Sequence, residues 1–130
     1  MALNDTIRAI VDGKNFATIA TLNADGSPQT SPVWITRDGD DLLVSTVIGR
    51  LKERNLRRDP RASITVFDHD NPYNYFEARG PVSFTEEGGF DLINDLSHKY
   101  VGSDYTGDEG TDNVRVIVRL TAEKVTGNAV

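Results

Sequence analysis

The chain contains no cysteine and only one methionine and one tryptophan among its 130 residues. Without cysteine it has no disulfide framework, thiol nucleophile or thiolate metal site. No apolar run approaches the ~20 residues that span a bilayer, and the first residues lack a basic region followed by an apolar one. We therefore expect a cytoplasmic protein that does not enter a membrane.

Several motifs that mark common enzyme classes are also missing. The sequence has no G-x-S-x-G and no G-x-G-x-x-G, which argues against a serine hydrolase and a nicotinamide-binding Rossmann unit. His69 and His98 are far apart, and Asp68-His69-Asp70 precedes Asn71-Pro72 as in a turn. We predict no metal site, and no side chain stands out as a catalytic residue.

The composition is that of a soluble globular protein, with 38% hydrophobic and 26% charged residues. At 14.3 kDa the chain is long enough for one core, so residues 1–130 are predicted to form a single domain. Its net charge is −6, but residues 50–61, here called the basic island, hold six of the 14 basic residues. Because the rest is acidic and the island lacks an aromatic side chain, nucleic-acid binding is not expected.

Alternating apolar residues predict a mainly β protein. The predicted strands cover residues 16–22, 29–36, 41–46, 63–67, 73–84 and 113–121. Pro28 and Pro32 place the second strand at an edge, because proline cannot donate to the ladder. Gly80 predicts a bulge or a close backbone approach. With roughly six strands and no βαβ alternation, a mainly antiparallel barrel is favoured.

Three short helices are expected. The first is capped by Asn4 or Asp5 and ends at Gly13 in a left-handed conformation. The second runs from residue 49 to about residue 58 within the basic island. The third occupies residues 86–100, where Phe90, Ile93, Leu96 and Tyr100 form an apolar stripe. Residues 102–112 are polar and rich in glycine, which predicts a surface loop or a lid.

The segment from Ser45 to Asn55 carries the strongest chemical signal. It runs from a strand through Gly49 into a basic helix, whose first N–H groups and positive dipole end favour an anion. Arg50 offers a planar fork to phosphate oxygens, Lys52 adds a point charge, and Asn55 adds hydrogen bonds. The segment therefore predicts a phosphate site. The alternative interpretation is a solvated helix face whose arginines meet surface carboxylates.

Aromatic residues flank the middle of the chain. Tyr73 and Tyr75 share one face of a strand, so together they are suited to line the pocket of a planar ligand or a subunit seam. The alternative for each aromatic residue, Trp34 included, is the barrel core.

Three stretches of the sequence resemble a known superfamily. They are FATIATLNADGSPQTSPVW at 16–34, GRLKERNLRRDPRAS at 49–63 and YFEARG at 75–80. Together they look like the pyridoxamine 5′-phosphate oxidase-like, FMN-binding split-barrel superfamily. Within it the chain is most similar to the flavin/deazaflavin oxidoreductases of actinobacteria that use coenzyme F420. The substrate-phosphate arginine and histidine set of a true pyridoxamine 5′-phosphate oxidase is not found, which argues against vitamin B6 oxidation.

The resemblance implies a split β-barrel homodimer with cofactor sites at the subunit seam. Arg50, Lys52 and Asn55 match positions that hold the phosphate end of the cofactor. The positions that match the strand segments along the cofactor ring and its side chain are Ser31, Pro32, Val33, Ser45 and Thr46. Tyr73 and Tyr75 match aromatic positions at the seam.

The implied function is transfer of a hydride from reduced F420 to an unsaturated or quinone-like small molecule. Three alternatives stay open: an FMN-binding oxidoreductase of the same fold, a protein that binds F420 or a flavin without catalysis, and a dimeric structural module that binds neither.

Overall fold

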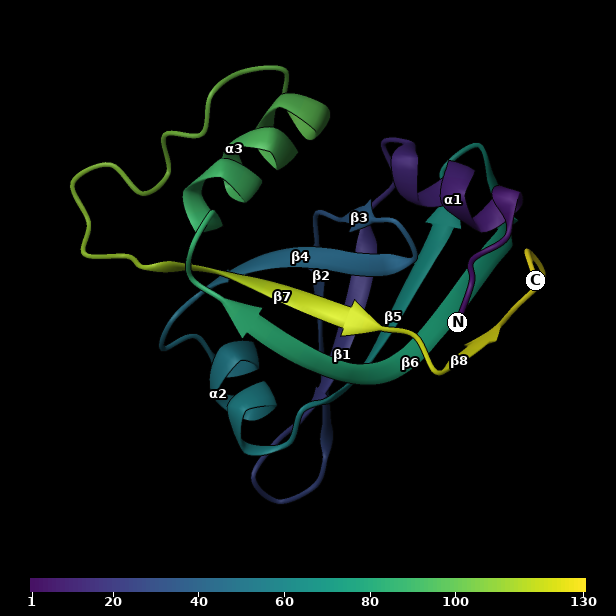
Figure 1. Ribbon diagram of the computed structural model, residues 1–130, viewed down its shortest axis with the longest axis horizontal. Coiled ribbons are helices and arrows are strands. Elements are labelled where there is room, and N and C mark those ends of the chain that lie inside the picture. The colour runs from purple at the N-terminus through teal and green to yellow at the C-terminus, as the bar shows by residue number, and fades with distance from the viewer.

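The computed structural model describes residues 1–130, which form eight strands and three helices (Figure 1). The strands are β1 Ala17–Leu22, β2 Pro28–Val33, β3 Thr36–Asp38, β4 Asp41–Val47, β5 Arg61–Asp68, β6 Asn71–Thr85, β7 Arg115–Thr121 and β8 Lys124–Thr126. The helices are α1 Asp5–Asp12, α2 Leu51–Arg58 and α3 Gly89–Tyr100. No helix combines the length and the apolar character needed to cross a membrane.

All strand pairs are antiparallel, in the order β2-β1-β5-β6-β7-β4-β3, with β8 on β6. The long strand β6 belongs to both halves of the sheet, since its first part pairs with β5 and its last part with β7. The sheet curls around the core (Figure 1). Its two end strands, β2 and β3, do not pair with each other, so the barrel stays open between them. The mainly β split barrel expected from the sequence is confirmed.

The barrel interior is filled by the residues that alternate along the strands. In β7 the inward side chains are Val116, Val118 and Leu120, all essentially inaccessible to solvent. Val118 and Leu120 join Phe76 of β6 and the α1 side chains in one cluster. Full burial of such a side chain stabilises the fold by about 1.5–3 kcal/mol. This core holds the two halves of the sheet together around the opening.

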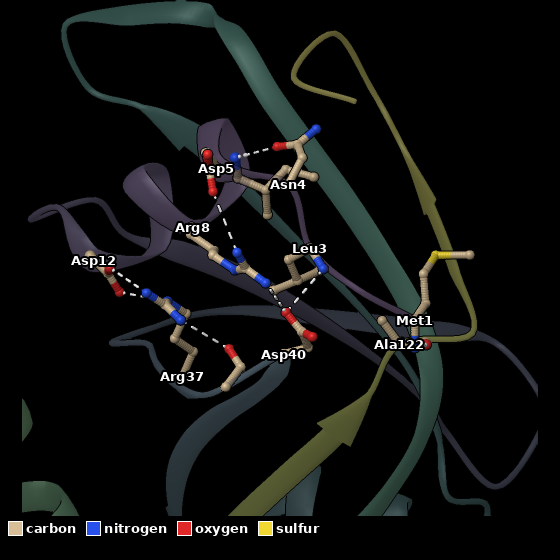
Figure 2. A network of polar contacts seen from close by, with 11 residues as sticks. Met1, Leu3, Asn4, Asp5, Arg8, Asp12, Arg37, Asp40 and Ala122 are labelled. Carbon is tan, nitrogen blue, oxygen red and sulfur yellow. Dashed lines mark hydrogen bonds and ion pairs between the residues drawn. The ribbon is translucent and has the colours of Figure 1, made fainter.

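A polar network ties α1 to the turn between β3 and β4 (Figure 2). Arg8 donates to Asp40 at 2.9 Å, and the same carboxylate accepts the backbone N–H of Leu3 at 3.1 Å. Arg37 donates through two nitrogens to Asp12 at 2.8 and 2.9 Å. These donors hold the pKa values of Asp40 and Asp12 below their ordinary range. The helix is therefore anchored by charge as well as by its apolar face.

The predicted strand 29–36 is two strands, because the chain turns away from the sheet at Trp34 and Ile35. The N–H of Ile35 donates to the Tyr100 hydroxyl at 3.2 Å, and its carbonyl accepts Lys99 Nζ at 2.7 Å. At Ile35, side chains of α3 thus form the hydrogen bonds that a neighbouring strand would otherwise form. The short strands β3 and β8 were not predicted, because three residues are too few to show an alternation.

Two details of the helix predictions are wrong. Gly13 ends α1 at a φ of −73°, not in the left-handed region. Glycine instead suits the limited space at this position. A Cβ would lie 3.0 Å from Asn15 Nδ2, which donates to the Ile10 carbonyl. Phe90 is 58% exposed, and Leu92 takes its place in the buried stripe of α3. The helix starts only at Gly89, and Phe90 in its first turn points away from the sheet.

Gly80 lies where β6 crosses from one half of the sheet to the other. A Cβ at this position would lie 2.0 Å from the backbone oxygen of Thr121. Only glycine allows these two strands to approach so closely. The close approach predicted from the sequence is confirmed.

We therefore expect Gly80→Ala to lower the free energy of unfolding by about 2 kcal/mol or more, since backbone must move to admit the methyl group. Urea denaturation followed by circular dichroism measures the change. Ser83→Ala, at an exposed position of the same strand, serves as control and should shift it by less than about 0.5 kcal/mol. Equal midpoints for Gly80→Ala and the wild type would contradict the close approach.

Candidate functional site

A cleft of about 290 Å³ lies where the sheet fails to close. The outer edge of β2 pairs with nothing, and β4 pairs with β3 only through Asp41, Leu42 and Leu43, so the rest of its edge is free. Pro32 and Val33 of β2 and Ser45 of β4 line the cleft between these edges. The unpaired edge that the prolines of β2 predicted therefore faces this space.

One wall of the cleft is aromatic. The ring of Tyr100 lies between Phe16 at 5.4 Å and Trp34 at 5.5 Å, and Tyr105 meets Trp34 edge-on at 6.4 Å. Phe16, Trp34 and Tyr105 line the cleft, together with Ile93 and Leu96 of α3. Such a row of rings offers a flat apolar surface to a planar conjugated ligand.

Another part of the cleft lining is cationic. Arg50, Lys52 and Arg115 all line it. Arg50 and Lys52 form no ion pair with any carboxylate of the chain. Burial lowers the pKa of Lys52, and the positive charges of Arg50 and Arg115 lower it further. This donor set fits a phosphate group, because a bound anion would relieve the mutual repulsion.

The start of α2 is held in place by Glu53. Its carboxylate, 5% exposed, accepts the Gly49 N–H at 2.8 Å and the Arg57 Nε–H at 2.9 Å. Gly49 has a φ of +98°, which favours glycine. The Gly49 N–H, followed by Arg57, keeps the pKa of Glu53 below its ordinary value. Glu53 thus fixes the turn that presents Arg50 and Lys52.

Asn55 is fully buried and does not line the cleft. Its Nδ2 donates to Thr21 Oγ1 at 3.1 Å and to Asn23 Oδ1 at 3.0 Å. The side chain therefore fastens α2 to the β1–β2 hairpin.

The strand residues expected at the site divide between two faces. Ser45 lines the cleft, whereas its neighbour Thr46 is fully buried on the interior face of β4. The hydroxyls of Ser31 and Thr46 are both buried without a hydrogen-bond partner. Pro32 and Val33 line the cleft. The structure thus brings Pro32, Val33, Ser45, Arg50 and Lys52 together in one cleft.

Tyr73 and Tyr75 lie at the start of β6 and do not line the cleft. Tyr73 is 81% exposed. The C-terminal residues run beside them, since Asn128 donates to the Tyr73 carbonyl and Ala129 to the Tyr75 carbonyl. Both side chains belong to the outer face of the sheet.

Sequence reasoning missed Arg115 and Tyr105 as cleft residues. Arg115 opens β7 and is 8% exposed, and Tyr105 lies in the segment 101–114 between α3 and β7, here called the strap. The signals were weak: one basic residue at the start of an apolar strand and one aromatic residue in a polar loop. Only the fold places them beside the basic island.

The sequence profile of the pyridoxamine 5′-phosphate oxidase family matches residues 3–129. The chain belongs to this family. As a member of a family named for an oxidase, it is placed among oxidoreductases of the flavin type at the family level. The superfamily expected from the three sequence stretches is thereby confirmed.

Solved structures of similar proteins share the split barrel of this family member. An F420 reductase is 26% identical, with a TM-score of 0.84 over 95% of this chain and 98% of that one. A conserved hypothetical protein of Mycobacterium tuberculosis is 25% identical, with a TM-score of 0.77 over 96% and 84% of the two chains. The General Stress Protein 26 of Bacillus anthracis, at 14% identity and a TM-score of 0.70 over 93% and 89%, shares the fold.

In this family member, we expect Glu53→Gln to lower the free energy of unfolding by about 1–3 kcal/mol at pH 7, because the Gly49 and Arg57 donors lose a buried carboxylate. The pKa of Glu53 is lowered by folding, so its contribution is complete above the ordinary value of 4.5 and is lost as the pH falls through the folded-state value. Urea denaturation at several pH values measures this.

The exposed Glu87→Gln variant is the control and should match the wild type at each pH. A Glu53→Gln deficit that stays constant down to pH 3 would contradict the role of the Glu53 charge.

Proposed function

We propose that the protein is an F420-dependent oxidoreductase that reduces an unsaturated or quinone-like small molecule. One observation carries this proposal: two cations without ion-pair partners and a row of aromatic rings line the same cleft at the opening of the barrel. A ligand with a conjugated ring and a phosphate group satisfies both sides. When bound in reduced form, F420 supplies the hydride.

The residues of the chain have separable tasks in this proposal. Arg50 binds the phosphate end through its planar fork, and Lys52 adds a point charge. Asn55 and Glu53 act indirectly, since they hold α2 and its first turn in place. The free edges at Ser31–Val33 and Ser45–Thr46 run along the ring and the side chain of the cofactor. The aromatic wall excludes water and orients a planar acceptor.

Two alternatives share the same site. An FMN-dependent oxidoreductase would use the same cations, and a binding protein without turnover would use the same cleft. We favour F420 because the F420 reductase structure matches nearly the full length of both chains at 26% identity.

We further propose that two copies of the chain form a homodimer through the outer face of β5 and β6. Tyr73 is 81% exposed and Phe67 46% exposed, and Tyr75 is paired with Phe67 across the two strands. A monomer rarely leaves such a group of large apolar side chains in solvent. In the dimer, Tyr73 and Tyr75 would reach the seam and the cofactor site of the partner.

The cofactor assignment predicts that F420 binds with a micromolar or lower Kd and that FMN binds more weakly. Titration of the purified protein, followed by ligand fluorescence at physiological salt, measures both. Tighter binding of FMN would move the protein to the flavin branch, and binding of neither would refute the cofactor site.

Charge reversal tests the anion-binding side. Arg50→Glu with Lys52→Glu should weaken F420 binding at least about 100-fold and leave the circular dichroism spectrum unchanged, because neither side chain forms an ion pair within the chain. Lys14→Glu with Lys124→Glu, at two exposed lysines outside the cleft, is the control for net charge and should bind as the wild type does. Unaltered affinity in the double variant would remove Arg50 and Lys52 from the site.

The dimer predicts a sedimenting mass of twice the 14.3 kDa chain. Tyr73→Asp should shift the mass toward the monomer, because it places a charge in an apolar seam, whereas Thr85→Asp at the far end of β6 should not. Analytical ultracentrifugation distinguishes the two states, and a monomeric wild type would contradict the proposed dimer.

A further inference from the structure

Arg115 is the centre of a hydrogen-bond cluster at the floor of the cleft. Its Nε and Nη2 donate to the two oxygens of Asp108 at 2.8 and 3.1 Å. The Nη2 also donates to the Tyr105 hydroxyl at 2.6 Å, and Nη1 lies 3.5 Å from Ser45 Oγ. One guanidinium therefore joins β4, the aromatic wall and the strap.

The charges around this guanidinium do not balance. Three cations, Arg50, Lys52 and Arg115, line the cleft. Asp108 is the single carboxylate that pairs with any of them. The pKa of Asp108 is held below its ordinary value by the bond from Arg115 first, and Asn113 and the charge of Arg50 also contribute. Asp108 is thus the one carboxylate that neutralises a cation of the cleft.

The two partners of this ion pair differ in how firmly the backbone holds them. Arg115 is the first residue of β7 and pairs with Val47 of β4. Asp108 lies in the strap, which connects α3 with β7 without strand pairing (Figure 1). Gly107 and Gly110 flank it at close range in the sequence, and Gly110 has a φ of +73°. Arg115 is therefore fixed by strand pairing, whereas Asp108 is held by hydrogen bonds from Arg115, Asn113 and Thr111 without any strand pairing.

We propose that Asp108 is the resident counter-ion of Arg115, and that a phosphate ester or pyrophosphate entering the cleft replaces it. Arg115 then becomes the third cation of the anion site, beside Arg50 and Lys52. This exchange rests on the proposed function in one respect, because the cofactor would bring the phosphate. The exchange itself requires only an anion.

The exchange also reaches the aromatic wall. Tyr105 belongs to the strap and shares Arg115 with Asp108, and it packs edge-on against Trp34. An anion that displaces Asp108 therefore changes the surroundings of Trp34, the only tryptophan of the chain. The emission of Trp34 reports the exchange without turnover and without cofactor.

Inorganic pyrophosphate is the probe, titrated at low salt into the full chain while Trp34 emission and calorimetric heat are recorded. Asp108→Asn should bind pyrophosphate about tenfold more tightly than the wild type, because the anion no longer competes with a carboxylate. Glu109→Gln removes the same charge one residue further on, where the side chain forms no ion pair with Arg115, and should bind within about twofold of the wild type. Equal or weaker binding by Asp108→Asn would overturn the exchange.

Arg115→Lys provides a second test in case Asp108→Asn does not fold. Lysine keeps the charge but loses the two-pronged contact, so pyrophosphate affinity should fall about tenfold. Unchanged affinity would overturn the role of Arg115. Parallel titrations with F420 separate the two proposals: if Asp108→Asn gains pyrophosphate affinity while no variant binds F420, the exchange stands and the proposed function fails.

Discussion

The opening of the barrel depends on how the backbone of Ile35 is satisfied. A buried backbone group needs a partner, and a strand normally supplies it. At Ile35 the partners are the Tyr100 hydroxyl and the ammonium of Lys99, both from the last turn of α3. Lys99 also donates to the Val11 carbonyl at the end of α1, and burial lowers its pKa to about 8. The sheet therefore ends at β2 on one side of Ile35 and begins again at β3 on the other.

This arrangement leaves two unpaired strand edges that face each other across a cleft. In most sheets such edges invite pairing with another chain. Here α3 and the aromatic row that includes Tyr100 cover one side, and the first turn of α2 covers the other. The same α3 contacts that keep the barrel open thus bring apolar and cationic side chains into one cleft. The cleft is a direct consequence of the incomplete closure.

The distribution of charge is a second property of the cleft. The chain is acidic overall, with a net charge of −6, yet three cations line its cleft and only Arg115 pairs with a carboxylate. Acidic residues nearby are committed elsewhere: Glu53 holds the turn before α2, and Asp108 holds Arg115. A buried or partly buried like-charge group is unfavourable until an anion joins it. The charges that line the cleft therefore favour an anionic ligand.

Much of the fold followed from the sequence alone. The alternation in 113–121, the prolines of β2, Gly80 and the basic island predicted a strand, an edge, a close approach and the helix α2, because each is a local pattern with a local physical cause. The sequence did not predict the short strands β3 and β8 or the exposed position of Phe90, since a few residues carry no period. The tertiary structure alone brought Arg115 and Tyr105 to Arg50 and Lys52, because residues more than 50 positions apart meet through the pairing of β4 with β7. The tertiary structure also places the β1–β2 hairpin within hydrogen-bond distance of the Asn55 amide, which the sequence of the helix does not indicate. Asn55 therefore holds α2 to that hairpin.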